Sequence, residues 1–269
     1  MSHQARKRFG QNFLYDQDVI QRIVHAINPR PGQRLVEIGP GQGAITLPLL
    51  KACEKLEVIE LDRDLVAPLD ARAQGYGQLV IHQSDAMRFD YSSLAQQEKI
   101  RIVGNLPYNI STPLIFHLMN YSSYIVDMHF MLQKELVDRM AAAPGGGDYG
   151  RLSVMIQYHC RVDPLFNVPP QAFQPVPKVD SAFVRLTPHA HPPVAVADYN
   201  CLVDLVRQAF SQRRKTLRNT LKPLLPVEEI ESAGVNPAAR AETLTLAQYA
   251  ALANRLAERN SSLSGTAPP

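Results

Sequence analysis

The sequence lacks any uninterrupted run of about 18 apolar residues, so we expect no membrane-spanning helix. Residues 1–8 are basic but no apolar segment follows them, and we therefore expect no signal peptide. Cysteine is scarce, since Cys53, Cys160 and Cys201 stand far apart without a C-x-x-C pair. This usage is typical of a reducing compartment and predicts neither a disulfide framework nor a metal site. We expect a cytoplasmic protein.

Internal repeats are also absent. A chain of 269 residues, of which 45% are hydrophobic, suits one large and one small domain. The net charge is only +3, yet basic residues gather at the start of the chain and in 207–222, a segment without an acid. Such clusters indicate an anionic partner, and the alternative is a solvated helix face. The candidate contacts are Arg6, Lys7, Arg8, Arg213, Arg214, Lys215 and Arg218.

Apolar runs alternate with helix-like segments in the first half, which is the pattern of a parallel sheet with helices on its faces. The predicted strands are 34–38, 55–61, 78–82, 100–103 and 126–132, and the predicted helices are 16–27, 44–53, 113–119 and 133–143. Ser111 or Thr112 is expected to cap the helix at 113.

In the second half of the sequence, proline-rich segments and a run of predicted helices replace this alternation. We predict late strands at 153–159 and 181–186, separated by a proline-rich, extended stretch at 168–178. Beyond the prolines of 188–193, the predicted helices are 198–222, 227–233, 237–240 and 246–259. We therefore predict an α/β domain over residues 1–188, a helical domain over 189–260 and a disordered tail over 261–269.

The tetrapeptide Asn105-Leu106-Pro107-Tyr108 directly follows a predicted strand. The Asn105 side chain and the Leu106 carbonyl supply two acceptors, which suit the N–H bonds of an exocyclic amino group. Pro107 fixes φ at about −65°, and Tyr108 offers a face on which a base can stack. Taken alone, the segment is better explained as a strand exit with a buried tyrosine.

Three other strand ends carry glycine or an acid. Gly39 and Gly41 lie in a turn after the first strand, where backbone can approach a ligand closely. Glu60 follows the second strand, where α/β folds bind a ribose diol, and Asp85 follows the third, where it can accept from an adenine amino group. Each acid alone is typical of a helix cap. Because these strand ends and Asn105 share one sheet edge, they indicate S-adenosylmethionine.

Several segments along the chain share one resemblance. They are Gln11–Leu14, Glu37–Gly41, Glu60–Asp62, Asp85-Ala86, Asn105–Ser111, Pro177–Ser181 and Phe210–Asn219. Together they resemble the bacterial small-subunit (16S) rRNA adenine N6-dimethyltransferases, over about residues 5–260.

The resemblance implies a Rossmann-like class I methyltransferase domain with a small all-helical C-terminal domain. It implies transfer of four methyl groups from S-adenosylmethionine, without a metal, to N6 of two adjacent adenosines in the 3′-terminal hairpin of the small-subunit rRNA. The expected partner is that rRNA within the immature 30S subunit, and we expect a monomer. A second aromatic for the target base falls on Phe173, for which a place in the core is an equal alternative. The family's cofactor contacts fall on Asn12, Leu14, Gly39, Glu60, Asp85 and Asn105.

Three other functions remain open. The large-subunit rRNA adenine dimethylases share the tetrapeptide and fold, although segments 11–14 and 210–219 favour the small-subunit enzyme. A factor that acts mainly in subunit assembly would also bind the rRNA, but the intact cofactor positions favour retained catalysis. An NAD-dependent oxidoreductase is disfavoured, because Pro40 removes an N–H from a G-x-G-x-G turn that lacks the dinucleotide spacing.

Overall fold

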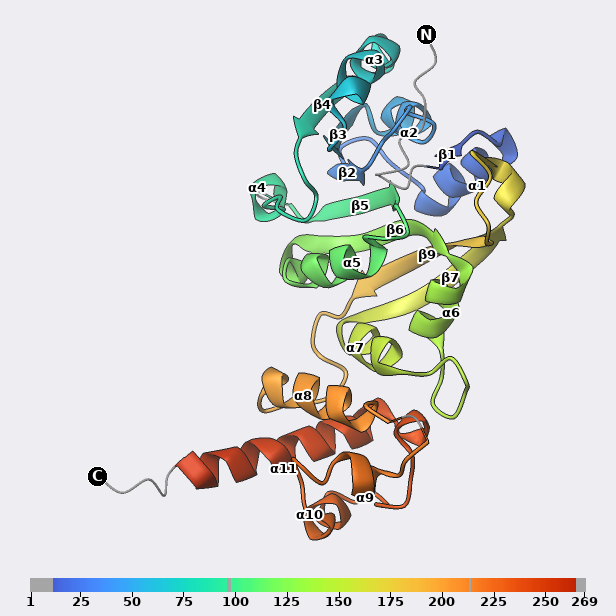
Figure 1. Ribbon diagram of the computed structural model, residues 1–269. Coiled ribbons are helices and arrows are strands. Elements are labelled where there is room, and N and C mark those ends of the chain that lie inside the picture. Colours follow the sequence, from blue (N-terminus) through green and yellow to red (C-terminus); the bar gives the residue numbers. More distant parts are fainter. Residues whose placement is uncertain (1–11, 96–97, 213, 265–269) are drawn as a thin grey trace. The chain divides into compact units, whose positions relative to one another are not determined.

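The computed structural model describes residues 12–95, 98–212 and 214–264 (Figure 1). The chain forms two compact units. The first holds the residues up to Val137 together with Arg161–Pro188, and the second holds Asp138–Cys160 together with the residues from His189 on. The predicted division into an α/β domain over 1–188 and a helical domain over 189–260 stays a prediction, and residues 138–160 group with the second unit.

A seven-stranded sheet frames the first unit, with the strand order β4-β3-β2-β5-β6-β9-β7 (Figure 1). Strands β4, β3, β2, β5 and β6 run parallel, and β9 is antiparallel to β6. Parallel neighbours require crossover connections, which the alternating helices supply. The strands are β2 (Leu35–Ile38), β3 (Lys55–Glu60), β4 (Gln78–Gln83), β5 (Ile100–Asn105), β6 (Ile125–Gln133), β7 (Cys160–Val168) and β9 (Ser181–Pro188).

The helices of this unit begin and end where local chemistry requires. The helix α1 (Gln17–Ile27) starts after Asp16, whose carboxylate accepts a hydrogen bond from the Val19 N–H at 3.1 Å. Its buried stripe includes Ile23 and Ile27 and joins the main core cluster. The other helices of this unit are α2 (Thr46–Cys53), α3 (Arg63–Ala73), α4 (Ser92–Ala95), α5 (Ser111–Met119), η2 (Ser122–Tyr124) and η3 (Pro170–Ala172).

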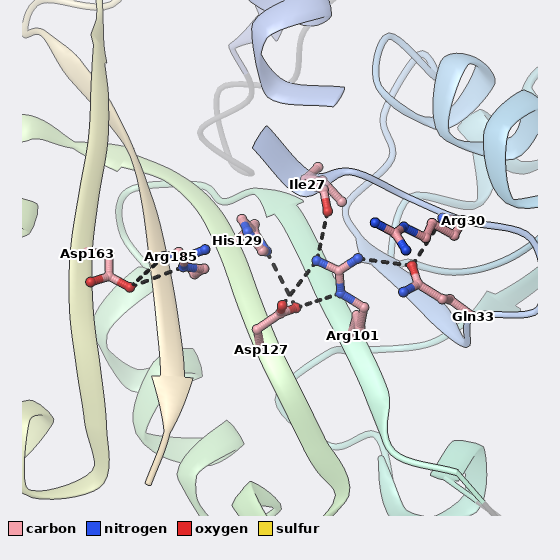
Figure 2. Close-up of polar contacts among 8 residues, drawn as sticks. All are labelled: Ile27, Arg30, Gln33, Arg101, Asp127, His129, Asp163 and Arg185. Carbon is pink, nitrogen blue, oxygen red and sulfur yellow. Dashed lines mark hydrogen bonds and ion pairs between the residues drawn. The ribbon is translucent and has the colours of Figure 1, made fainter. Parts of the chain in front are cut away.

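A polar network around Arg101 links the end of α1 to the sheet, as Figure 2 shows. Arg101 on β5 donates to both carboxylate oxygens of Asp127 on β6, at 2.9 and 3.0 Å. The same guanidinium donates to the Gln33 side chain at 3.0 Å and to the Ile27 carbonyl at 2.8 Å. Because Arg101 and Asp127 are only 12% and 15% exposed, this network fixes the end of α1 against the sheet.

A separate two-stranded sheet joins distant parts of the first unit. Strand β1 (Phe13–Leu14) pairs antiparallel with β8 (Phe173–Gln174), opposing Leu14 to Phe173. The Tyr15 N–H also donates to the Ala172 carbonyl at 3.0 Å. The segment that precedes α1 is therefore held against residues 172–174.

The second unit is largely helical. It contains α7 (Arg151–His159), α8 (Tyr199–Ala209), α9 (Leu217–Thr220), α10 (Val227–Ser232), η4 (Ala241–Thr243) and α11 (Leu246–Ser264), while α6 (Lys134–Ala141) spans the division between the units. Among the described helices, none combines the length and apolar composition that a bilayer crossing needs.

Three predicted elements were wrong. Residues 153–159 form the helix α7 instead of a strand, because buried side chains on several sides of it leave no visible helical period. The predicted helix 198–222 ends at Ala209, and the Leu217 and Arg218 N–H groups bind carbonyls of residues 239 and 237. The segment 237–240 is a turn.

Two predicted helix ends also differ. The helix α5 begins at Ser111, and the residue before it, Ile110, has no polar side chain that could cap it. Ser111 lies inside the helix and its hydroxyl donates to the Pro107 carbonyl at 2.9 Å, so it does not act as the predicted cap. At the other end of the chain, α11 continues to Ser264, past the predicted start of the tail at 261, and residues 265–269 lie outside the described residues.

Candidate active site

A cavity of about 180 Å³ lies in the first unit, at the carboxyl ends of β2, β3, β4 and β5. Such edges are where open α/β sheets bind ligands. Every predicted cofactor residue and the whole tetrapeptide line this cavity. They are Asn12, Leu14, Gly39, Gly41, Glu60, Asp85, Asn105, Leu106, Pro107 and Tyr108.

The glycine turn after β2 forms one wall. Gly39 and Gly41 have φ angles of 68° and 57°, in the left-handed region that favours glycine. A Cβ at position 41 would lie only 3.1 Å from Cε1 of Phe13. Glycine at this position therefore lets β1 approach the turn.

Glu60, at the end of β3, holds that turn in place. One carboxylate oxygen accepts from the Gly41 N–H at 3.2 Å, and the other accepts from the Asp62 N–H at 2.7 Å. Burial raises the pKa of Glu60, although these two backbone donors oppose the shift. The carboxylate is thus fixed in the cavity wall at the position predicted for a ribose contact.

Asp85 follows β4, and its predicted contact with an adenine amino group stays a prediction. One carboxylate oxygen accepts from the Met87 N–H at 2.9 Å, which is a local turn contact. Asp85 lines the cavity together with its neighbours Ser84 and Ala86. A carboxylate has several acceptor positions, so the turn contact leaves capacity for a ligand.

The tetrapeptide is fixed at three points. The Asn105 side-chain N–H donates to the Asn12 carbonyl at 3.0 Å, which leaves its amide oxygen as an acceptor for other groups. The Leu106 N–H donates to the Met131 carbonyl on β6 at 3.3 Å. The Tyr108 hydroxyl lies 2.8 Å from the Ser181 hydroxyl oxygen.

Phe173 has the surroundings of a core residue. It is 1% exposed, belongs to the same hydrophobic cluster as Leu14 and Phe183, and is absent from the described residues that line the cavity. This arrangement agrees with the packing alternative, and a clamp on the target base would require the ring to move. That role stays a prediction.

Glu37 is a cavity residue that our sequence reasoning did not single out. It lies in β2, is 1% exposed, and one of its carboxylate oxygens has no hydrogen-bond partner among the described residues. Burial raises its pKa to about 8, with the neighbouring Glu60 adding to the shift. The available signal was an acid within an otherwise apolar strand, Leu35-Val36-Glu37-Ile38.

The predicted RNA contacts are only partly described. Arg6, Lys7, Arg8 and Arg213 lie outside the described residues. The remaining three belong to the second unit and are exposed; they are Arg214, Lys215 and Arg218. Their role in binding stays a prediction.

The strand order, with a late antiparallel strand inserted beside β6 and a cavity at the carboxyl edge, defines a Rossmann-like methyltransferase fold. A family model described as "Ribosomal RNA adenine dimethylase" matches residues 2–258. The chain belongs to this family, which confirms the resemblance. The alternative of an NAD-dependent oxidoreductase is therefore set aside.

Similar proteins agree with this assignment. The "Ribosomal RNA small subunit methyltransferase A" of Pseudomonas aeruginosa is 62% identical over 257 residues, which cover 95% of this chain and 96% of the relative. A dimethyladenosine transferase from Plasmodium falciparum has a similar structure, with a TM-score of 0.78 and 25% identity over 93% of this chain and 98% of the other. The 23S rRNA methyltransferase ErmE also has a similar structure, with a TM-score of 0.73 and 26% identity over 91% of this chain and 100% of the other.

Proposed function

We propose that this protein transfers four methyl groups from S-adenosylmethionine to N6 of two adjacent adenosines in the 3′-terminal hairpin of small-subunit rRNA. The observation that carries the proposal is one cavity that combines a glycine turn, two carboxylates and the Asn105–Tyr108 tetrapeptide. The high identity to relatives named for the small subunit, 62% and 56% for two of them, favours that rRNA over the 23S rRNA on which ErmE acts.

The cavity fits S-adenosylmethionine. Gly39 and Gly41 bring backbone to the wall without a side chain, and Glu60 and Asp85 supply acceptors for a ribose diol and an adenine amino group. Glu37, with a pKa raised to about 8 by burial, would be largely protonated at neutral pH and would present a neutral carboxyl group to this part of the wall. When bound, the donor supplies a methyl group on a sulfonium, which is already a good electrophile.

The tetrapeptide would then orient the attacking nitrogen. The N6 hydrogens of adenine donate to the Asn105 amide oxygen and the Leu106 carbonyl, so the nitrogen lone pair can point along the S–CH3 axis. Alignment of this kind can supply about 7–11 kcal/mol of the barrier. The N-methylated product is acidic and loses its proton to water, so the mechanism requires no dedicated base.

The target base must leave its stack before it can reach this position. Stacking on Tyr108 would offset about 1–3 kcal/mol of the free energy lost when the base leaves its stack. A monomethylated adenine has a single N–H, so the second transfer must proceed with one acceptor unused. The exposed residues Arg214, Lys215 and Arg218 would bind phosphates, which adds affinity without reading sequence.

We also propose the setting in which the reaction occurs. The immature 30S subunit would be the substrate, and the protein would act as a monomer in the cytoplasm. Cys53, Cys160 and Cys201 form no disulfide within the described part of the chain, which suits a reducing compartment. Binding to the immature subunit would additionally contribute to its biogenesis.

The test uses small subunits from a strain in which this gene is deleted. Wild-type protein and S-adenosylmethionine should produce N6,N6-dimethyladenosine, detected by mass spectrometry of the nucleosides and mapped to the hairpin by primer extension. Asn105→Ala should reduce transfer at least about hundredfold, because both alignment and an acceptor are lost.

The matched control is Asn120→Ala, an exposed asparagine at the end of α5. It should retain wild-type turnover. Methylation at another base, or normal turnover by Asn105→Ala, would contradict the proposal. The biogenesis role is tested by expressing the inactive Asn105→Ala protein in the deletion strain. If normal subunit profiles return, binding of the protein contributes to subunit assembly without methyl transfer.

A further inference from the structure

Tyr108 has a buried partner on the neighbouring part of the sheet. Its hydroxyl lies 2.8 Å from the Ser181 hydroxyl oxygen, although the two residues are 73 positions apart in sequence. Tyr108 lines the cavity and is half-buried, whereas Ser181 is 0% exposed. The contact therefore joins a cavity residue to a buried one that is not among the described residues lining the cavity.

Ser181 sits on a rigid support. It is the first residue of β9 and is paired with Gln133, the last residue of β6. The preceding residue, Asp180, accepts from the Lys134 N–H at 2.9 Å. These backbone contacts fix the Ser181 hydroxyl at the carboxyl edge of the sheet.

The other end of the tyrosine is also fixed. Its backbone follows Leu106, whose N–H binds the Met131 carbonyl on β6, and Pro107, whose carbonyl accepts from the Ser111 hydroxyl. An aromatic side chain has two rotatable torsions, and anchoring both of its ends leaves it little freedom. The hydroxyl is occupied by Ser181, so the ring face remains as the part that can stack with a base.

We propose that Ser181 is a positioning residue, which holds the Tyr108 ring in the orientation that receives the target adenine. The proposal rests on the function proposed above, in which Tyr108 stacks with that base. A ring that is held before the base arrives loses no rotational freedom on stacking, so capture of the base is stronger. Without Ser181, the hydroxyl would lose its partner and the ring could turn.

A double-mutant cycle tests this pairing. The variants are Ser181→Ala, Tyr108→Phe and the double variant, assayed on small subunits from the deletion strain. Each single variant should raise the KM for subunits about tenfold, which corresponds to about 1.4 kcal/mol. The double variant should be no worse than either single one, because each change already breaks the same bond. The Kd for S-adenosylmethionine should stay within about twofold of wild type.

A buried serine elsewhere provides the matched control. Ser153 is also 0% exposed, and its hydroxyl donates to the Arg139 carbonyl in the second unit. Ser153→Ala should lower the melting temperature without changing the KM for subunits. This separates the loss of any buried hydroxyl from the loss of the one that holds Tyr108.

Several results would overturn the proposal. A double variant impaired about hundredfold would show that the two residues act independently. Wild-type KM in Ser181→Ala would show that the contact does not matter for capture. Parallel losses of subunit affinity, cofactor affinity and melting temperature would reveal a general structural role. If the wild-type protein itself formed no N6-methylated adenine in the same assay, the proposed function would fail first.

Discussion

Gly41 provides the sharpest test of how the cavity wall is built. Its φ of 57° costs a residue with a Cβ about 1–2 kcal/mol. In Gly41→Ala the new Cβ would also lie 3.1 and 3.2 Å from two ring carbons of Phe13. Phe13 belongs to β1 and lies between Asn12 and Leu14, so we expect a ring that must give way to shift these two cavity residues as well.

We expect two separable effects. The backbone cost should lower the melting temperature by about 2–4 °C for each kcal/mol lost. The displacement of β1 should weaken S-adenosylmethionine binding about tenfold, equivalent to about 1.4 kcal/mol. Thermal denaturation and isothermal titration calorimetry measure the two quantities on the same samples.

Gly32→Ala is the matched control. Gly32 has a φ of 82°, so alanine there meets the same kind of backbone cost, but no described atom lies within 4 Å of its new Cβ. It should lower the melting temperature and bind the donor like wild type. Equal affinities for the two variants would refute the reasoning that Phe13 transmits the effect.

Three further predictions concern charge. Arg101→Met should reduce the free energy of unfolding by about 3 kcal/mol at neutral pH, measured by urea denaturation, because the buried Asp127 loses its nearest charged partner and keeps the His129 ring nitrogen 3.6 Å away. Burial alone would raise the pKa of Asp127, but His129 and Arg101 lower it overall; its stabilising contribution is therefore complete above about pH 4 and lost as pH falls through the lowered folded pKa, so the deficit of Arg101→Met should shrink in acid. Glu60→Gln should weaken donor binding about ten- to hundredfold. Because burial raises the pKa of Glu60, the donor affinity of the wild-type protein should begin to fall at a higher pH than for an ordinary glutamate as the pH is lowered, and the variant should show no such fall. Combined Arg214→Glu and Lys215→Glu should flatten the salt dependence of subunit binding in filter-binding assays, whereas an unchanged slope would place the rRNA elsewhere.

The central strands could be predicted from sequence because they are buried on both faces. Residues 35–38 and 100–103 read as short apolar runs followed by glycine or polar positions, and both are strands of the parallel sheet. Strand ends of a parallel sheet share one edge, which is why Gly39, Glu60 and Asn105 were expected together and do line one cavity.

Other elements left no readable local signal. The run that forms α7 is apolar on several sides, so its period gave no choice between helix and strand. Strand β7 contains Pro164, which reads as a break although the strand continues through it to Val168. The pairing of β1 with β8 and the contact of Tyr108 with Ser181 depend on tertiary structure, and no short-range pattern encodes them.

The pairing of β1 with β8 also constrains when the enzyme can become competent during its own synthesis. Asn12 and Leu14 are translated long before Phe173 and Gln174, the residues that hold them in place. A nascent chain therefore has an incomplete donor pocket until most of the first unit has left the ribosome. This order of assembly implies that a half-made polypeptide, still attached to the ribosome, has the cavity without the β1 side of its wall in its final place.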